Sequence, residues 1–220
     1  MNSRTLKESF IRVIILLIGL IIAHLGVTLF LLSNMGSDPF NVLIQGLFRS
    51  LQGVMPSAIP FTHGITHMSI SLLIIGVLLF VDKSYVKIGT LLCMICGGPI
   101  IDFFTFVLGG VVNDGLPYAI RIIILAVGCI ILAYGMTIVI KSDSGTGPND
   151  LVAIVISDKL KKRFSITRII VDVCFVIIGY ILGGVFGLGT IICAALVGPV
   201  AGVFLPKNET IINNIVKRLL

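Results

Sequence analysis

Long apolar segments separated by short polar turns make up most of the chain. In the first half they cover about 13–32, 66–81 and 88–108, and each is close to the roughly 20 residues that a helix needs to cross about 30 Å of hydrocarbon. A second set follows the polar turn at 113–117. The pattern predicts an all-α integral membrane protein with six transmembrane helices.

Two polar, glycine-bearing breaks interrupt this pattern, S-N-M-G-S-D-P-F-N at 33–41 and K-S-D-S-G-T-G-P-N-D at 141–150. Pro39 and Pro148 suit the first position of a helix, where the missing N–H costs nothing. Asp38 is placed to cap the first helix, and Asp150 falls in the first turn of the second. The breaks therefore predict short helices at about 39–51 and 148–160. The first is amphipathic and too short to cross, so it should be re-entrant or interfacial. The fold that we expect has both short helices re-entrant.

The two halves of the chain repeat each other. Residues 12–42 align with 121–151 at an offset of 109, with 12 identities in 31 positions. Later matches have offsets of 101 (65–67 with 166–168) and 100 (89–99 with 189–199). The repeats predict two units, 1–112 with spans one to three and 113–220 with spans four to six.

Three spans per unit is an odd number, so the second unit enters the membrane from the opposite side and the repeats are inverted. The positive-inside rule supports this orientation independently, because it places 14 lysines and arginines on the cytoplasmic side and only Arg49 and Arg121 outside. We therefore expect both termini and the segment 159–163 in the cytoplasm, and the loop 52–64 outside.

Composition agrees with a multi-pass protein of a bacterial cytoplasmic membrane. Hydrophobic residues make up 57% of 220 and charged residues 12%, far from the values of a soluble domain. The net charge of +6 is concentrated beside the spans, which argues against nucleic acid as a partner and for anionic lipid headgroups near Lys159, Lys161, Lys162 and Arg163. The five cysteines lie in apolar runs and are interpreted as packing residues, so we expect neither a metal nor a cofactor. A homodimer is compatible with the sequence but is not required by it.

The breaks supply the candidate substrate-binding residues. Helix N-termini at membrane depth favour anionic or strongly accepting groups, and Gly145 and Gly147 would let the backbone adopt positive φ and approach a solute. The aspartates leave alternatives open, since they could cap the helices, neutralise their ends, or carry a proton or cation. The candidates are Asn34, Gly36, Ser37, Asp38, Asn41, Asp143, Ser144, Gly145, Thr146, Gly147, Asn149 and Asp150.

Three ionisable residues inside the spans are candidates for proton or ion coupling, because ionisable groups at membrane depth are costly. They are His24, Asp102 and Asp172. For His24 the alternative is a neutral packing histidine, and for Asp172 it is an ion pair with Arg168, one turn earlier. His63 and His67 have a spacing that metal sites use, but no carboxylate or cysteine accompanies them.

The motifs G-S-D-P-F-N at 36–41 and G-T-G-P-N-D at 145–150, with Gly189-Thr190 and Gly198-Pro199, resemble the bacterial YczE/YyaS/YitT group of multi-span membrane proteins over the whole chain. Asp38 departs from the small residue usual before that proline. The resemblance implies a membrane protein whose activity is unassigned, with transport the usual suggestion. We expect a non-enzymatic small-solute transporter or channel with a midplane site between the two short helices. The alternatives are a membrane scaffold or regulator and, remotely, an intramembrane hydrolase using Ser144, for which no histidine follows in the chain.

Overall fold

The computed structural model describes residues 5–52, 62–162 and 164–220, and these ranges contain only helices and connections. The predicted all-α class is therefore confirmed, and the two short helices begin at Pro39 and Pro148 as predicted. Most of the loop expected outside, 52–64, lies outside the described residues. The helices are α1 (Leu6–Ser33), α2 (Pro39–Gln52), α3 (His63–Val81), the 3-10 turn η1 (Lys83–Tyr85), α4 (Ile88–Leu108), α5 (Tyr118–Ser142), α6 (Pro148–Leu160), α7 (Phe164–Ile181) and α8 (Leu188–Leu219).

Five of the described helices are long and apolar enough to cross a membrane: α1, α3, α4, α5 and α8. In α7 the clearly apolar part, Ile169–Ile181, is shorter. At about 1.5 Å per residue the 32 residues of α8 extend roughly 48 Å, well beyond a 30 Å hydrocarbon layer. Its C-terminal turns therefore project past the apolar region, beside the N-terminal turns of α1.

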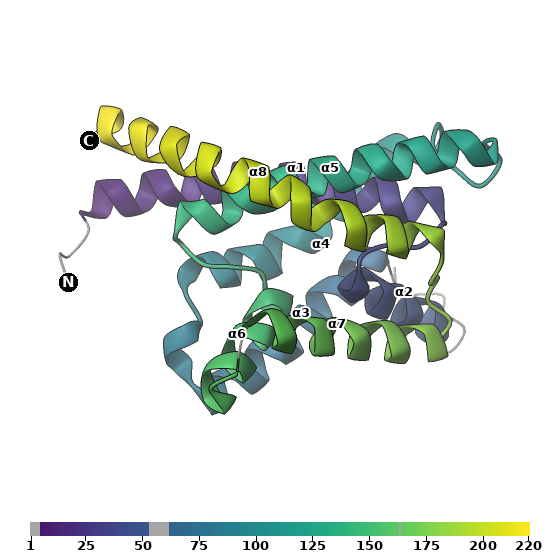
Figure 1. Ribbon diagram of the computed structural model, residues 1–220, viewed down its shortest axis with the longest axis horizontal. Coiled ribbons are helices and arrows are strands. Elements are labelled where there is room, and N and C mark those ends of the chain that lie inside the picture. The colour runs from purple at the N-terminus through teal and green to yellow at the C-terminus, as the bar shows by residue number, and fades with distance from the viewer. Residues whose placement is uncertain (1–4, 53–61, 163) are drawn as a thin grey trace.

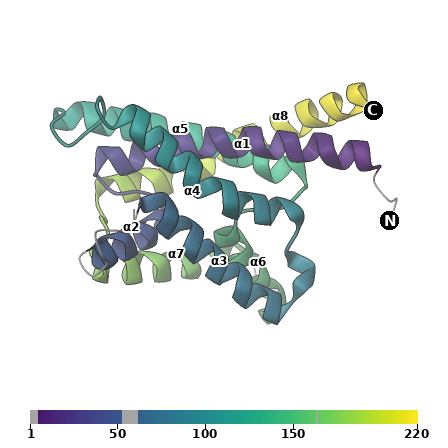
Figure 2. The same ribbon diagram turned by 180° about the vertical axis from the view of Figure 1, so that it is seen from behind.

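The helices form two layers (Figures 1 and 2). One contains α1, α5 and α8 side by side, and the other contains α2, α3, α6 and α7. Helix α4 leads from α3 to α1 and packs against both. The start of α1 and the end of α8 lie at the same end of the molecule, where Lys7 Nζ is 3.5 Å from the Leu220 carbonyl oxygen. We call this the terminal end.

Helices α1 and α5 are antiparallel and meet at glycines. A Cβ added to Gly26 would lie 2.5 Å from the carbonyl oxygen of Gly128, and one added to Gly135 would lie 2.7 Å from that of Gly19. Gly19 aligns with Gly128 and Gly26 with Gly135 in the sequence repeat, so the two contacts are equivalent. Backbone-to-backbone approach of this kind is how small residues hold helices together where lipid removes the hydrophobic drive.

Two buried clusters flank this contact and consist of aligned residues. The first contains Phe30, Met35, Leu125, Cys129 and Cys193. The second contains Leu16, Leu20, Cys93 and Val139. Offsets of 109 and 100 convert Leu16, Leu20 and Cys93 into Leu125, Cys129 and Cys193. The cysteines at these positions are small packing groups in the helix interfaces, as interpreted from the sequence.

Polar contacts join η1 to the C-terminal half of α6. Lys159 Nζ lies 3.0 Å from Asp82 Oδ2, and the Tyr85 hydroxyl donates to Asp158 Oδ2 at 2.9 Å. The Ser84 hydroxyl and amide both donate to Asp82, and these bonds, with Lys159, lower the pKa of Asp82 to about 2. The hydrogen bond to Asp158 raises the pKa of Tyr85, and the bond to Asp82 raises that of Lys159.

We expect the stabilisation by Asp82 to be fully present above its ordinary pKa of about 3.8 and to disappear as the pH falls through about 2, because the lowered pKa keeps the carboxylate charged. Melting temperatures of the wild type and Asp82→Asn in detergent, compared from pH 2 to 6, test this. The difference should be constant above about pH 5, shrink as the pH falls below about 4, and be largely lost near pH 2. A difference that vanishes already at pH 4 would contradict the assigned contacts.

Candidate functional site

Each break is held by a backbone hydrogen bond to the first turn of a helix from the other half. The Gly89 amide at the start of α4 donates to the Ser144 carbonyl at 3.0 Å, and the Gly189 amide at the start of α8 donates to the Met35 carbonyl at 2.9 Å. Gly89 aligns with Gly189, and Met35 with Ser144. We call these two bonds the backbone clasps. They fix the irregular segment between each long helix and the short helix that follows it.

Two aligned arginines satisfy the C-terminal carbonyls of the neighbouring long helix. Arg12 near the start of α1 donates to the Ser142 carbonyl at 3.3 Å, and Arg121 near the start of α5 donates to the Ser33 carbonyl at 2.7 Å. Carbonyls at a helix end have no intrahelical partner, so a guanidinium meets a need of the backbone there. This pair also fixes the antiparallel register of α1 and α5.

The starts of the short helices agree with the predicted placement of the aspartates, but the backbone at Gly147 differs from the prediction. Asp38 Oδ1 accepts from the Asn41 amide at 3.3 Å, and Asp38 Oδ2 accepts from the Asn41 side chain at 2.6 Å, so Asp38 caps α2 as predicted. Asp150 lies in the first turn of α6. Gly145 has φ +149°, but Gly147, the N-cap of α6, has φ −59°. The expectation of positive φ at Gly147 was therefore wrong, since the proline after it favours an extended residue.

The break residues fall into two groups. Asn34 and Asp143 end α1 and α5 in the left-handed conformation, at opposite ends of the molecule. Asp143 is exposed and lies 3.4 Å from Lys87 Nζ. Gly36 and Ser37 are buried. The remaining candidates lie nearer the short helices and are buried or half-buried: Asn41, Ser144, Gly145, Thr146, Gly147, Asn149 and Asp150.

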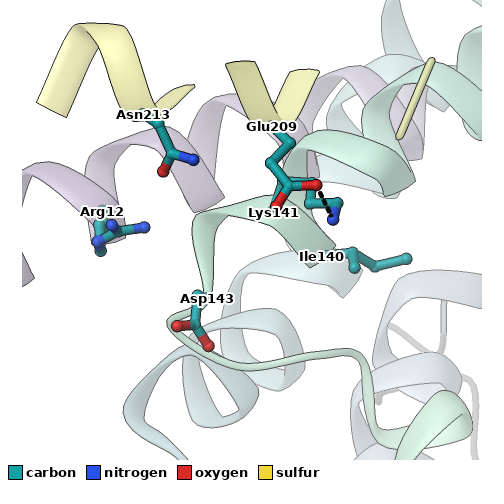
Figure 3. A pocket seen from close by; sticks show the side chains of 6 residues that line it. All are labelled: Arg12, Ile140, Lys141, Asp143, Glu209 and Asn213. Carbon is teal, nitrogen blue, oxygen red and sulfur yellow. Dashed lines mark hydrogen bonds and ion pairs between the residues drawn. The ribbon is translucent and has the colours of Figure 1, made fainter. Parts of the chain in front are cut away.

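Two cavities lie beside Asp143 and Asn34. Figure 3 shows one of about 270 Å³ at the terminal end, lined by Arg12, Ile140, Lys141, Asp143, Glu209 and Asn213, with Lys141 and Glu209 paired. The other, about 280 Å³, lies at the opposite end and includes Asn34 and Asp114. Asn34 and Asp143 are aligned positions, so each cavity adjoins the beginning of a break rather than the start of a short helix.

A buried polar cluster inside the first half was not anticipated as a unit. The rings of His24 on α1 and His67 on α3 meet edge to face at 5.6 Å, and Phe40 at the start of α2 contacts His67 at 5.5 Å. Leu20's carbonyl accepts from His24 Nδ1 at 2.9 Å, so His24 is the Nδ1–H tautomer when neutral. A Cβ on Gly97 would lie 2.8 Å from His24 Nε2. The sequence made His24 a coupling candidate and paired His67 with His63 by spacing, but it did not bring His24 and His67 together. Gly97, opposite both rings in α4, was the signal that could have done so.

The other two coupling candidates have different settings. Asp102 Oδ2 accepts from the Thr62 hydroxyl at 2.6 Å and Oδ1 from the Gly64 amide at 3.0 Å, so Asp102 holds the N-terminus of α3 against α4. Asp172 lies half-buried on α7. The side chain of Arg168, its predicted partner, lies outside the described residues.

Several buried polar atoms near the breaks make no hydrogen bond within the described part of the chain. A buried polar group without a partner is costly, and more so in a membrane, unless water or a solute reaches it. Asn41 adjoins the start of α2, Thr90 adjoins Gly145, and Ser71 lies one turn beyond His67 on α3. The atoms are Asn41 Oδ1, His67 Nδ1, Ser71 Oγ and Thr90 Oγ1.

A family model described as "Family of unknown function (DUF6198)" matches residues 10–206. The chain is 28% identical over 201 residues to the "Uncharacterized membrane protein YczE" of Bacillus subtilis, covering 91% of this chain and 88% of that protein. It is 27% identical over 195 residues to the "Uncharacterized protein YyaS" of the same species, covering 87% and 91%. An "Uncharacterized protein" of Haemophilus influenzae is 28% identical over 191 residues, covering 87% and 82%. No solved structure matches significantly. The predicted resemblance is confirmed.

We expect Gly36→Ala and Gly145→Ala each to destabilise the protein by about 2 kcal/mol or more. Both glycines have positive φ, and the added Cβ would lie 2.9 Å from the Thr190 amide nitrogen or 2.6 Å from that of Thr90. Unfolding in detergent measures the effect.

Gly147→Ala is the matched control in the same break, because its φ is negative and its Cβ would meet only side-chain atoms, those of Asn149 and Asp150, and no backbone. Equal stabilities of Gly145→Ala and Gly147→Ala would contradict the described conformation of this break.

Proposed function

The chain belongs to the DUF6198 family of unknown function, and we propose that it is a small-solute transporter or channel of the bacterial cytoplasmic membrane. One of its relatives is named a membrane protein, and the five long apolar helices agree with that name. In this proposal the units 1–112 and 113–220 are inverted repeats. Helix α7, at 18 residues and about 27 Å, is the sixth span.

The observation that carries the proposal is the reciprocity of the contacts between the halves. The arginine contacts, the backbone clasps and the glycine contacts each occur twice, and the residues of one copy align with the residues of the other. A twofold axis in the membrane plane accounts for all three pairs at once. Many secondary transporters are built in this way, with irregular backbone near the axis.

The contacts of α2 support a re-entrant path. Phe40 at its start packs on Phe175, in the interior of α7, at 5.5 Å between ring centres. Arg49, about two and a half turns later, donates to the carbonyl of Gly183, beyond the end of α7. The N-terminus of α2 thus lies deeper along α7 than its C-terminus, so the chain enters through the break and returns through the helix. Backbone of this kind is tolerated at depth where it lines a cavity.

The solute would pass between the starts of α2 and α6. Asn41 Oδ1 and Thr90 Oγ1 are buried acceptors with no partner in the described residues, one at each break. Amide groups in the first turns of α2 and α6 add positive potential, and Asp38 and Asp150 add negative charge beside it. Such mixed groups suit a small polar solute better than a purely apolar one.

Gly147→Leu should abolish solute flux while the protein remains folded, because the added side chain occupies the start of α6 and its Cβ meets only the side chains of Asn149 and Asp150. The measurement is uptake of a panel of radiolabelled small solutes into proteoliposomes, compared with protein-free liposomes. Gly110→Leu, in open space at a distant turn, is the control that should keep wild-type flux.

Wild-type flux from folded Gly147→Leu would remove this site from consideration. A wild type that carries none of the panel and gains no thermal stability from any member would favour the scaffold alternative, since a bound solute stabilises by mass action.

The proposed orientation predicts opposite accessibility for Gln52 at the end of α2 and Lys161 after α6. Single cysteines at these exposed positions should react with a membrane-impermeant maleimide in intact cells at 52 and not at 161. Both should react once the cells are opened. Equal reaction at both sites in intact cells would contradict inverted repeats.

A further inference from the structure

The two halves differ in how the second and third long helices of each half meet. Helix α3 packs along α4 with backbone contact, since a Cβ on Gly64 or on Gly98 would lie 2.3 Å from the carbonyl oxygen of the other glycine. Asp102 on α4 reinforces the contact by accepting from Thr62 and Gly64 at the start of α3. We call this pair of hydrogen bonds the Asp102 latch. It closes one side of the protein.

The equivalent face of α8 is open. Gly98 and Asp102 align with Gly198 and Gly202, and a Cβ on either of these would have no atom within 4 Å. Helix α7 makes its close contacts with α2 and α6 instead, and the views in Figures 1 and 2 place it in the opposite layer from α8. Gly202 carries no side chain to form a latch. The glycine surface of α8 is therefore uncovered in the second half, whereas α3 covers the equivalent surface of α4 in the first half.

We propose that the protein alternates between this structure and a second one in which α7 packs on α8 at Gly198 and Gly202 while α3 separates from α4. This inference rests on the proposed transport function and specifies its conformational cycle. Because the two halves repeat each other in sequence, α7 can approach α8 in the direction in which α3 approaches α4. Ser165 aligns with Gly64, and because serine has a Cβ the two backbones stay further apart than in the first half.

The short helices link this exchange to the candidate site. A Cβ on Gly46 of α2 would lie 2.2 Å from the carbonyl oxygen of Gly179 on α7, so α2 and α7 are in backbone contact and move together. Movement of α7 toward α8 displaces the start of α2, with Asn41 and Phe40, relative to His67 on α3. The site then opens on the side of α3 and α4 and closes on the side of α7 and α8.

Spin labels at aligned positions test the exchange directly. Ser69 and Phe103 report the distance between α3 and α4, and the equivalents Ile170 and Val203 report that between α7 and α8; all four are exposed. Labels are placed in a background with Cys96→Ala and Cys174→Ser, in liposomes, and distances are measured by double electron–electron resonance. We expect two distances for each pair, with the 69–103 pair mainly short and the 170–203 pair mainly long.

Asp102→Ala should raise the ratio of the second state to the first about tenfold, so that 69–103 lengthens and 170–203 shortens together. Gly198→Leu should remove the short 170–203 distance, alone and combined with Asp102→Ala, because its side chain occupies the surface that α7 would cover. Gly76→Leu, also in open space but on α3, is the matched control and should leave both distributions unchanged.

A single distance for each pair in the wild type, in Asp102→Ala and in Gly198→Leu would overturn the inference. So would short distances that appear in one pair without lengthening of the other. Because the labels report conformation without any solute, their result is separate from the flux assay. Flux with fixed distances would refute the exchange alone, and exchange without flux would leave the exchange standing and count against transport.

Discussion

The structure depends on the backbone contact between α1 and α5. Glycines at aligned positions let the two helices approach so closely that any Cβ would collide with main-chain atoms of the partner. A membrane offers little hydrophobic drive for helix association. The close approach and its van der Waals contacts therefore hold α1 and α5 together, as the burial of apolar side chains holds a soluble protein together. The antiparallel direction then places each break beside the first turn of α4 or α8, where the clasps form.

Sequence periodicity and proline placement predicted the helices well because both act locally. The starts of α2 and α6 at Pro39 and Pro148 follow from proline's fixed φ, and Asp38 caps α2 because its carboxylate needs only the backbone three residues away. The internal repeat added long-range information, since aligned glycines identify the faces that meet.

What the sequence did not predict depends on tertiary partners. Asp102 was a candidate for ion coupling, and its hydrogen bonds to Thr62 and Gly64 join segments about 40 residues apart. His67 is packed against His24 only because Gly97 removes a side chain between them. The negative φ of Gly147 reflects the competing preference of a residue before proline over glycine's freedom. In each case local propensity was compatible with several arrangements.

The backbone clasps have a consequence for how freely the two halves can diverge. Their acceptors are the carbonyls of Met35 and Ser144, which every residue possesses, so a thioether and a hydroxyl serve equally well there. Only the donor side is restricted, because the glycine at 89 or 189 leaves room for the crossing chain. An architecture held by main-chain groups can thus retain its geometry while side-chain identity drifts, which is consistent with 12 identities in 31 positions between segments that make the same contacts. The geometry of this protein is therefore set by a few glycines and by hydrogen bonds between backbone groups.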